Sequence, residues 1–147
     1  MLHKKKICGI LTELALDGRD IDYVIIGIGI NVLNHKFPEE ICQTASSILL
    51  ETGKNINRED LITEVWKVFA VYYDIFLHTQ DFSFLKEEYE TYLVNKDKQV
   101  VVLEPSGSYE GTALGITNKG ELLVDTKDGQ KQVSGGEVSV RGIYGYV

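Results

Sequence analysis

The chain opens with two apolar stretches that decide its fold, Lys6-Ile7-Cys8-Gly9-Ile10-Leu11-Thr12-Glu13 and Val24-Ile25-Ile26-Gly27-Ile28-Gly29-Ile30-Asn31. Both are rich in β-branched residues, and turn-forming residues lie between them, so we expect paired antiparallel strands over residues 6–15 and 21–32. Glycine weakens an ordinary strand because it packs no side chain. Glycines at three positions therefore indicate that a ligand closely approaches the backbone of this hairpin.

The length of the turn decides which residue faces Lys6. A two-residue turn at Asp17-Gly18 would place Lys6 opposite Gly29, whereas a four-residue loop over 17–20 would place it opposite Asn31. Directly opposed residues in an antiparallel pair lie about 4.5–5.5 Å apart. Both registers bring Lys6 beside the same end of the second strand, although a bulge would shift the pairing.

These residue types suit a nucleotide. The ammonium group of Lys6 is a compact charge for a phosphate, and a preplaced cation is most effective when charge builds on the α-phosphate. Asn31 offers both a donor and an acceptor, which suits the edge of an adenine, and Gly9 and Gly27 would admit a flat ring system. The spacing is equally compatible with a glycine-rich hairpin packed on a helix, with Lys6 solvated at its end.

Composition limits the class of protein. The 147 residues fit one modest domain or two small ones, and the net charge of -7 argues against a nucleic-acid-binding surface. The sequence contains no apolar run of membrane-spanning length and no signal-peptide pattern at its start. Cys8 and Cys42 have no metal-ligand spacing and are typical of core residues in a reducing compartment. We therefore expect a cytoplasmic protein without membrane contact, nucleic-acid binding or a metal site.

The remaining sequence changes character near residue 95. Before it, we expect helices over residues 38–52, from Asn57 onward, and over 83–94. After the polar stretch 95–98, short β-rich runs follow at 99–104, 109–116, 121–126 and 131–140, separated by turn residues. Short strands at this regular spacing predict a small barrel or sandwich.

The motifs, taken in order, resemble those of a biotin protein ligase. The resemblance rests on the stretches Lys6–Glu13 and Gly27–Asn31, on Ala45-Ser46-Ser47-Ile48 with Glu51-Thr52-Gly53, and on residues 134–145, Ser-Gly-Gly-Glu-Val-Ser-Val-Arg-Gly-Ile-Tyr-Gly. It implies an α+β fold: a partial mixed or antiparallel sheet with packed helices, as in half of a class II synthetase-like ligase, followed by a small SH3-like β-barrel. Residues 1–95 would be the C-terminal part of the catalytic domain and 96–147 the SH3-like C-terminal domain.

The resemblance also implies an activity. Members of this family form biotinyl-5′-AMP from biotin and ATP, then transfer biotin to a lysine of a biotin carboxyl carrier protein or a carboxylase carrier domain. ATP, Mg²⁺ and biotin would be substrates, with no permanently bound cofactor. We also expect a homodimer through the open sheet edge, because an unpaired strand edge is a template for pairing.

The motifs carry roles over to particular residues. Lys6 resembles the lysine that contacts the activated carboxyl group of biotin and the α-phosphate, and Gly9 resembles part of the biotin pocket floor. Gly27, Gly29 and Asn31 resemble the adenylate side, with Asn31 reading adenine, and residues 32–44 resemble the loop that covers the adenylate. Glu137 and Arg141 match the C-terminal motif, where they would either orient ATP across the domain interface or fix the barrel to the catalytic domain.

The chain departs from the family pattern in what it lacks. The Gly-Arg-Gly-Arg-type loop, the Lys-Trp-Pro-Asn-Asp stretch and the DNA-binding winged helix of some members are absent. We therefore expect a ligase fragment with little or no activity alone. Two alternatives remain open, a lipoate-type ligase fragment and a non-catalytic module that binds a carrier protein.

Overall fold

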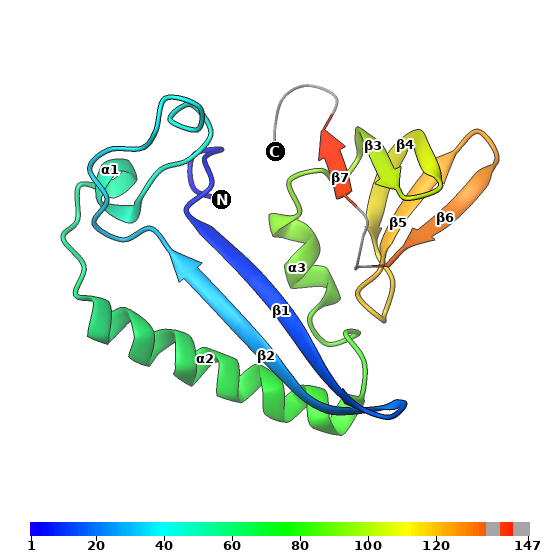
Figure 1. Ribbon diagram of the computed structural model, residues 1–147, viewed down its shortest axis with the longest axis horizontal. Helices are drawn as coiled ribbons and strands as arrows, with labels where there is room; N and C mark the ends of the chain where they lie inside the picture. The colour runs from blue at the N-terminus through cyan, green and yellow to red at the C-terminus, as the bar shows by residue number, and fades with distance from the viewer. Residues whose placement is uncertain (135–138, 143–147) are drawn as a thin grey trace. The chain divides into compact units, whose positions relative to one another are not determined.

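The computed structural model describes residues 1–134 and 139–142, with the side chains of Ser139 and Arg141 excepted. The chain divides into two compact units, Met1–Val65 and Trp66–Val147, which are described separately below. Figure 1 gives the order of the elements along the chain.

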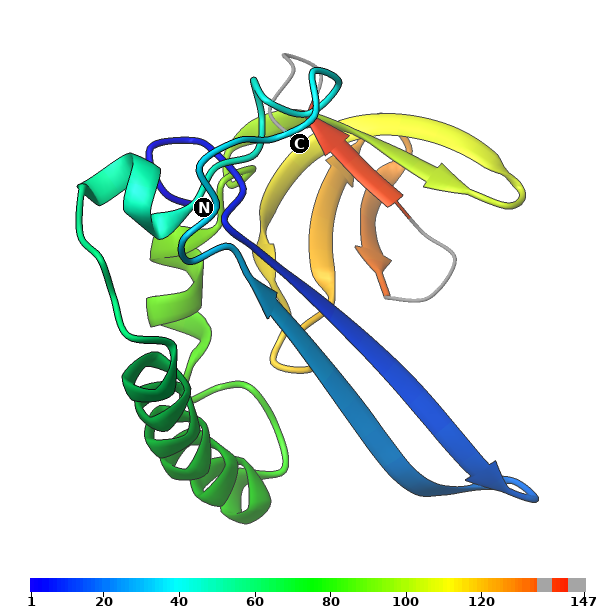
Figure 2. The same cartoon turned by 60° about the vertical axis from the view of Figure 1, so that its left-hand side comes forward.

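The first unit is dominated by a long antiparallel hairpin. Strands β1 (Cys8–Asp17) and β2 (Asp20–Ile30) pair along their whole length, as Figure 2 shows. Gly18 adopts a positive φ of 64° at the tip, where the chain turns within two residues. The predicted hairpin is confirmed. At its open end, β1 begins at Cys8 instead of Lys6, and β2 ends at Ile30 instead of Val32.

The hairpin is exposed on both faces. Ten of its large apolar side chains are 45–68% exposed, namely Ile10, Leu11, Leu14, Leu16, Ile21, Tyr23, Val24, Ile25, Ile26 and Ile28. Contiguous apolar surface on this scale is typical of an interaction surface. Within the unit, burial is concentrated instead beyond the base of the hairpin, at Val32, Ser46 and Ser47.

The segment after β2 contains much less helix than predicted. Only α1 (Ile48–Thr52) is helical, and residues 39–44 form turns, so the expected helix over 38–52 is wrong in its first part. The cause is Ser47, whose extended backbone and side-chain acceptor for the Leu50 amide fix the helix start there. Gly53 ends the helix in the left-handed conformation, as predicted.

Helix α2 (Arg58–Thr79) begins directly after Asn57, as predicted. The Asn57 Oδ1 atom accepts a hydrogen bond of 2.7 Å from the Glu59 amide, which satisfies one of the free donors of the first turn. Helix α3 (Lys86–Tyr92) is shorter than the expected 83–94. Among the described residues, no helix is long and apolar enough to cross a membrane.

The second unit contains a five-stranded antiparallel sheet of order β6-β5-β4-β3-β7. Its strands are β3 (Lys98–Glu104), β4 (Gly107–Ile116), β5 (Leu122–Thr126), β6 (Gly129–Val133) and β7 (Ser139–Gly142). The predicted strands are confirmed, except that the run 131–140 supplies parts of two strands. Over residues 1–134 and 139–142, β6 and β7 remain the sheet edges and no pairing closes a barrel.

The core of this sheet consists of small aliphatic side chains. Val100, Val102, Ala113 and Val124 are fully buried and form one cluster. Gly111 is required where β4 approaches β5, because a Cβ atom there would lie 2.5 Å from the carbonyl oxygen of Asp125. The backbones can therefore approach closely only with glycine at this position.

Glu90 connects α3 to the same sheet. Its carboxylate accepts hydrogen bonds from Lys96 Nζ at 2.5 Å and from the Ile116 amide at 3.1 Å. Both hydrogen bonds, that from Lys96 foremost, hold the pKa of Glu90 below its usual range. A Cβ atom on Gly115 would collide with this carboxylate, so glycine leaves the space that Glu90 occupies.

Candidate functional site

A bulge in β2 places Gly9 directly opposite Gly29. At the tip Leu16 pairs with Ile21, but the next pair is Ala15 with Tyr23, so one residue of β2 is extra. Every later pair is shifted by that residue. Without the bulge, Gly9 would face the isoleucine at position 28 instead of Gly29.

The three hairpin glycines share one face. Gly29 lies opposite Gly9, and Gly27 lies opposite Leu11 two residues further along. Side chains two residues apart on a strand point to the same side, and opposed residues share that side. We call this side, with Gly9, Gly27 and Gly29, the glycine face. It offers bare backbone at Gly27 and Gly29 of β2 and at Gly9 of β1, whereas Leu11, opposite Gly27, carries a side chain on this face.

The structure places Lys6 differently from either predicted register. Lys6 faces neither Gly29 nor Asn31, so that prediction is wrong: it forms an isolated parallel bridge with Ala45. Its amide donates to the Thr44 carbonyl at 2.7 Å, and its carbonyl accepts from Ser46 at 3.0 Å. The bulge moves the hairpin register by one residue relative to the pairing that the four-residue loop predicted. In addition, β1 begins only at Cys8, so Lys6 lies outside the paired strands.

The side chain of Lys6 nevertheless reaches the glycine face. A Cβ atom built on Gly9 would lie 3.8 Å from Lys6 Cε, so the lysine stem extends over the position that a side chain of residue 9 would fill. Lys6 and all three glycines are exposed. Lys6 therefore lies beside Gly9 of its own segment, and its predicted association with the Gly29/Asn31 end of β2 stays a prediction.

Asn31 is held at the base of the hairpin by three hydrogen bonds. Its amide donates to the Ile7 carbonyl at 2.8 Å, and its carbonyl accepts from Ile48 at 2.9 Å. Its side-chain Nδ2 donates to the Ser46 carbonyl at 3.1 Å. The Asn31 side chain is therefore tethered by one donor.

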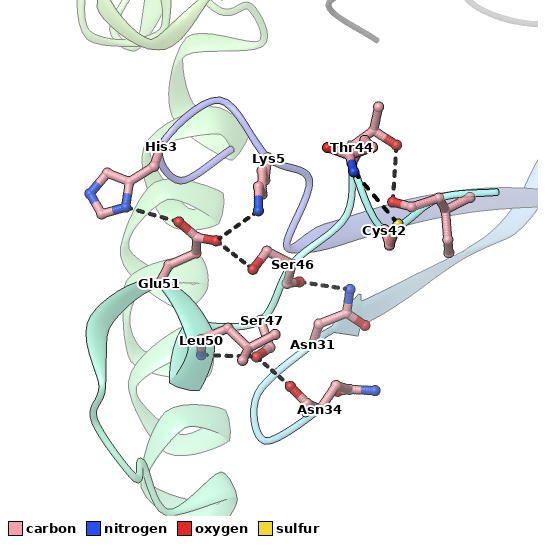
Figure 3. Close-up of polar contacts among 12 residues, drawn as sticks. His3, Lys5, Asn31, Asn34, Cys42, Thr44, Ser46, Ser47, Leu50 and Glu51 are labelled. Atoms are coloured by element: carbon pink, nitrogen blue, oxygen red, sulfur yellow. Dashed lines mark hydrogen bonds and ion pairs between the residues drawn. The ribbon is translucent and has the colours of Figure 1, made fainter. Parts of the chain in front are cut away.

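A buried polar cluster supports this region, as Figure 3 shows. The Glu51 carboxylate, 12% exposed, accepts from Ser46 Oγ at 2.6 Å and contacts His3 Nδ1 at 3.0 Å and Lys5 Nζ at 3.7 Å. The Ser46 hydroxyl, then the His3 ring, lowers the pKa of Glu51, which favours its ionised form. Ser46 is 1% exposed, so its hydroxyl depends on this acceptor.

Sequence reasoning missed this cluster. Ser47 donates to the Asn34 carbonyl at 2.7 Å and caps α1, which carries Glu51 toward Ser46. The available signal was a serine directly before the apolar run at 48–50, a pattern typical of a helix start. The contacts from His3 and Lys5 join residues far apart in sequence and had no local signal.

The C-terminal motif is only partly visible. Glu137 lies outside the described residues. Arg141 is described for its backbone alone, which lies in β7 opposite Val101. Their predicted roles at a domain interface therefore stay predictions.

Comparison with known proteins identifies the family. A sequence model described as "Biotin protein ligase C terminal domain" matches residues 97–141. The bifunctional ligase/repressor BirA of Bacillus spizizenii is 31% identical over 142 residues, which are 95% of this chain. The apo biotin protein ligase of Aquifex aeolicus has a TM-score of 0.83 at 31% identity, over 96% of this chain. The chain belongs to the biotin protein ligase family.

The match is to part of each relative. The chain spans 43% of the length of the Bacillus spizizenii BirA and 61% of the apo Aquifex aeolicus ligase. The Aquifex aeolicus ligase in complex with biotin and ATP is similar with a TM-score of 0.81 and 32% identity, over 95% of this chain and 57% of that one. The helices and antiparallel sheets of the present chain, which match these ligase structures, confirm the predicted α+β class.

Proposed function

We propose that this chain supplies one wall of a site that forms biotinyl-5′-AMP and transfers biotin to a lysine of a carboxylase carrier domain. The observation that carries the proposal is the glycine face, with Lys6 extending over Gly9 at its end. The related Aquifex aeolicus ligase that was solved with biotin and ATP supports the choice of these two ligands.

Lys6 is the proposed catalytic residue. In the first step, a carboxylate oxygen of biotin attacks the α-phosphorus of ATP, and pyrophosphate leaves. Negative charge builds on the α-phosphate oxygens in this transition state, and a fixed ammonium group beside them lowers the barrier. Gly9 would form the floor of the biotin site, because it leaves bare backbone beside the Lys6 stem, whose Cε atom lies within van der Waals contact of its Cβ position.

Gly27, Gly29 and Asn31 are the proposed adenylate side. The bare backbone at Gly27 and Gly29 would let the nucleotide lie against the sheet. Nδ2 of Asn31 is already bonded to the Ser46 carbonyl, which fixes the side-chain plane and directs its carbonyl oxygen. An adenine amino group is a donor that this acceptor would suit.

The second step needs a partner. The amine of a carrier-domain lysine attacks the carbonyl carbon of biotinyl-5′-AMP, an amide forms, and AMP leaves with the bonding electrons and the phosphate charge. Mg²⁺ would enter with the ATP phosphates rather than as a resident ion. Residues 32–44 are the proposed cover over the adenylate.

The finer domain assignment is also proposed. We assign residues 1–95 to the catalytic domain and 96–147 to an SH3-like C-terminal domain. The match of the C-terminal family model to 97–141 and the five-stranded order support this division. Free thiols at Cys8 and Cys42 support a reducing, cytoplasmic setting.

The open hairpin supports two further expectations. Because its apolar side chains are exposed, the 147-residue chain alone should show little ligase activity, since adenylate chemistry requires a site closed to water. The unpaired strand edges favour a homodimer, which sedimentation at several concentrations would detect.

Ligand binding tests the proposal without requiring turnover. We expect calorimetry to show binding of a non-hydrolysable biotinyl-adenylate analogue to the wild-type chain, and weaker binding to Lys6→Ala. Lys54→Ala, an exposed lysine of the same unit, is the matched control. Preference for the lipoyl analogue would favour a lipoate-type ligase, and binding of the carrier domain alone would favour an interaction module; either result would overturn the proposal.

A further inference from the structure

We propose that Glu51 is a positioning residue, which acts through Ser46 to fix the Asn31 side chain and the backbone of Lys6. The inference rests on the proposed function for what Lys6 and Asn31 bind. The placement of these groups by Glu51 is a separate claim with its own readout.

Ser46 is the connection between the two ligand-facing residues. Its amide donates to the Lys6 carbonyl at 3.0 Å, and its carbonyl accepts from Asn31 Nδ2 at 3.1 Å. Its hydroxyl donates to Glu51 Oε1 at 2.6 Å. One buried residue thus contacts both proposed site residues with its backbone and is held through its side chain, as Figure 3 shows for Ser46, Asn31 and Glu51.

Glu51 is itself fixed from two sides. It lies in α1, whose start and end are set by Ser47 and Gly53. Its second oxygen contacts His3, and Lys5 lies 3.7 Å from the oxygen that binds Ser46. The carboxylate therefore joins the residues just before Lys6 to the segment that pairs with Lys6.

The chemistry explains why a carboxylate stands here. An ionised carboxylate only accepts hydrogen bonds, so both of its oxygens can serve donors at once. Hydrogen bonds to a charged acceptor are shorter and stronger than neutral ones. Without this acceptor the Ser46 hydroxyl would be buried and unsatisfied, and the segment would have to move to reach another partner. Such a movement would shift the carbonyl that holds Asn31.

The placement can be measured on the Asn31 side-chain amide by nuclear magnetic resonance of the ¹⁵N-labelled chain. We expect Glu51→Ala to shift these resonances and to speed their hydrogen exchange by about tenfold, because local opening exposes hydrogen-bonded protons to water. Glu51→Gln keeps one acceptor oxygen and should give a smaller change, and it carries the test if Glu51→Ala does not fold. Glu40→Gln, an exposed carboxylate before α1, is the control and should change nothing.

A double-mutant cycle tests whether the effect passes through Ser46. If it does, Ser46→Ala and Glu51→Ala should together alter the Asn31 amide no more than either change alone. Additive effects, or an Asn31 amide unmoved by Glu51→Ala and Glu51→Gln, would overturn the proposal.

Nucleotide selectivity separates this inference from the proposed function. We expect the wild-type chain to bind ATP more tightly than GTP, and Glu51→Ala to reduce that ratio about tenfold by misplacing the base-reading amide. General loss of structure would weaken both nucleotides without changing their ratio. A wild-type chain that binds neither nucleotide would refute the proposed function, while the Asn31 resonances would still decide the positioning role. An unchanged ratio in a variant whose Asn31 amide has moved would refute the assignment of Asn31 to the base.

Discussion

Replacing Glu90 should loosen α3 from the five-stranded sheet, and the size of the loss can be worked from its contacts. The carboxylate is 15% exposed and binds both Lys96 Nζ and the Ile116 amide. In Glu90→Ala the amide of Ile116, a buried residue, loses its acceptor. An unsatisfied buried donor costs about 1–3 kcal/mol, so we expect the free energy of unfolding to fall by about 2 kcal/mol.

The pH dependence gives a second, signed expectation. Because the folded pKa of Glu90 is lowered, its charge stabilises the fold above the pKa of an unfolded glutamate and ceases to do so as pH falls through the folded value. The pKa of Lys96 is raised by Glu90, so its contribution is present at low pH and is lost only as pH rises through its folded value. The ion pair of Glu90 and Lys96 should therefore contribute its full stabilisation of the fold between about pH 5.5 and 9.5.

Thermal and urea unfolding of three variants would check this reasoning. Glu90→Ala should lower the melting temperature by roughly 4–8 °C at pH 7. Glu90→Gln retains an oxygen for the Ile116 amide and should lose less, and its difference from wild type should be smaller at an acid pH below the lowered pKa of Glu90 than at pH 7. Glu87→Gln, an exposed residue of the same helix, is the control. If Glu90→Ala matched the control at pH 7, or if the difference were the same at both pH values, the reasoning would be wrong.

Two glycine substitutions should behave in opposite ways. Gly111→Ala places a Cβ atom 2.5 Å from the Asp125 carbonyl oxygen and 2.6 Å from Val124 Cγ1, and should lower the free energy of unfolding by about 1–3 kcal/mol in urea titrations; an unchanged midpoint would contradict the close approach of β4 and β5. Gly29→Ala meets no atom nearer than 3.9 Å and should change stability by no more than about 0.5 kcal/mol, yet weaken binding of the biotinyl-adenylate analogue in calorimetry. Undiminished binding by Gly29→Ala would remove the glycine face from the ligand site.

The elements with strong local signals were predictable. Alternating turn residues and β-branched runs gave the strands of the second unit, and Asn57 marked the start of α2. The helix expected over 38–52 failed because apolar spacing alone ignored Ser47 as a cap and the pairing of Lys6 with Ala45. That pairing joins segments almost forty positions apart, and no local pattern specifies it.

The members of the proposed site were chosen from residue types, and their geometry could not be predicted from the sequence. Glycine in an apolar strand and a lysine at its end identified Gly9, Gly29 and Lys6 from residue type. Their pairing depended on a bulge, which neither turn alternative included. The network behind them, from Glu51 to Asn31 through Ser46, is tertiary and left only a helix-start signal in the sequence.

The bulge near the hairpin tip determines the pairing of Gly9 at the other end of the hairpin, which it does not contact. It lies six residues along β1 from Gly9, a span of about 20 Å, yet it alone sets which residue Gly9 faces. Straightening the bulge without changing the chain length would move the register by one step, place Ile28 opposite Gly9 and turn every β2 side chain beyond it to the other side of the ribbon, whereas deleting the extra residue, Asp22, would remove the bulge and leave Gly9 opposite Gly29. A chain with one codon fewer at the bulge would therefore keep its glycines paired, whereas a straightened tip of the same length would set a β2 side chain opposite Gly9 without altering any residue beside it.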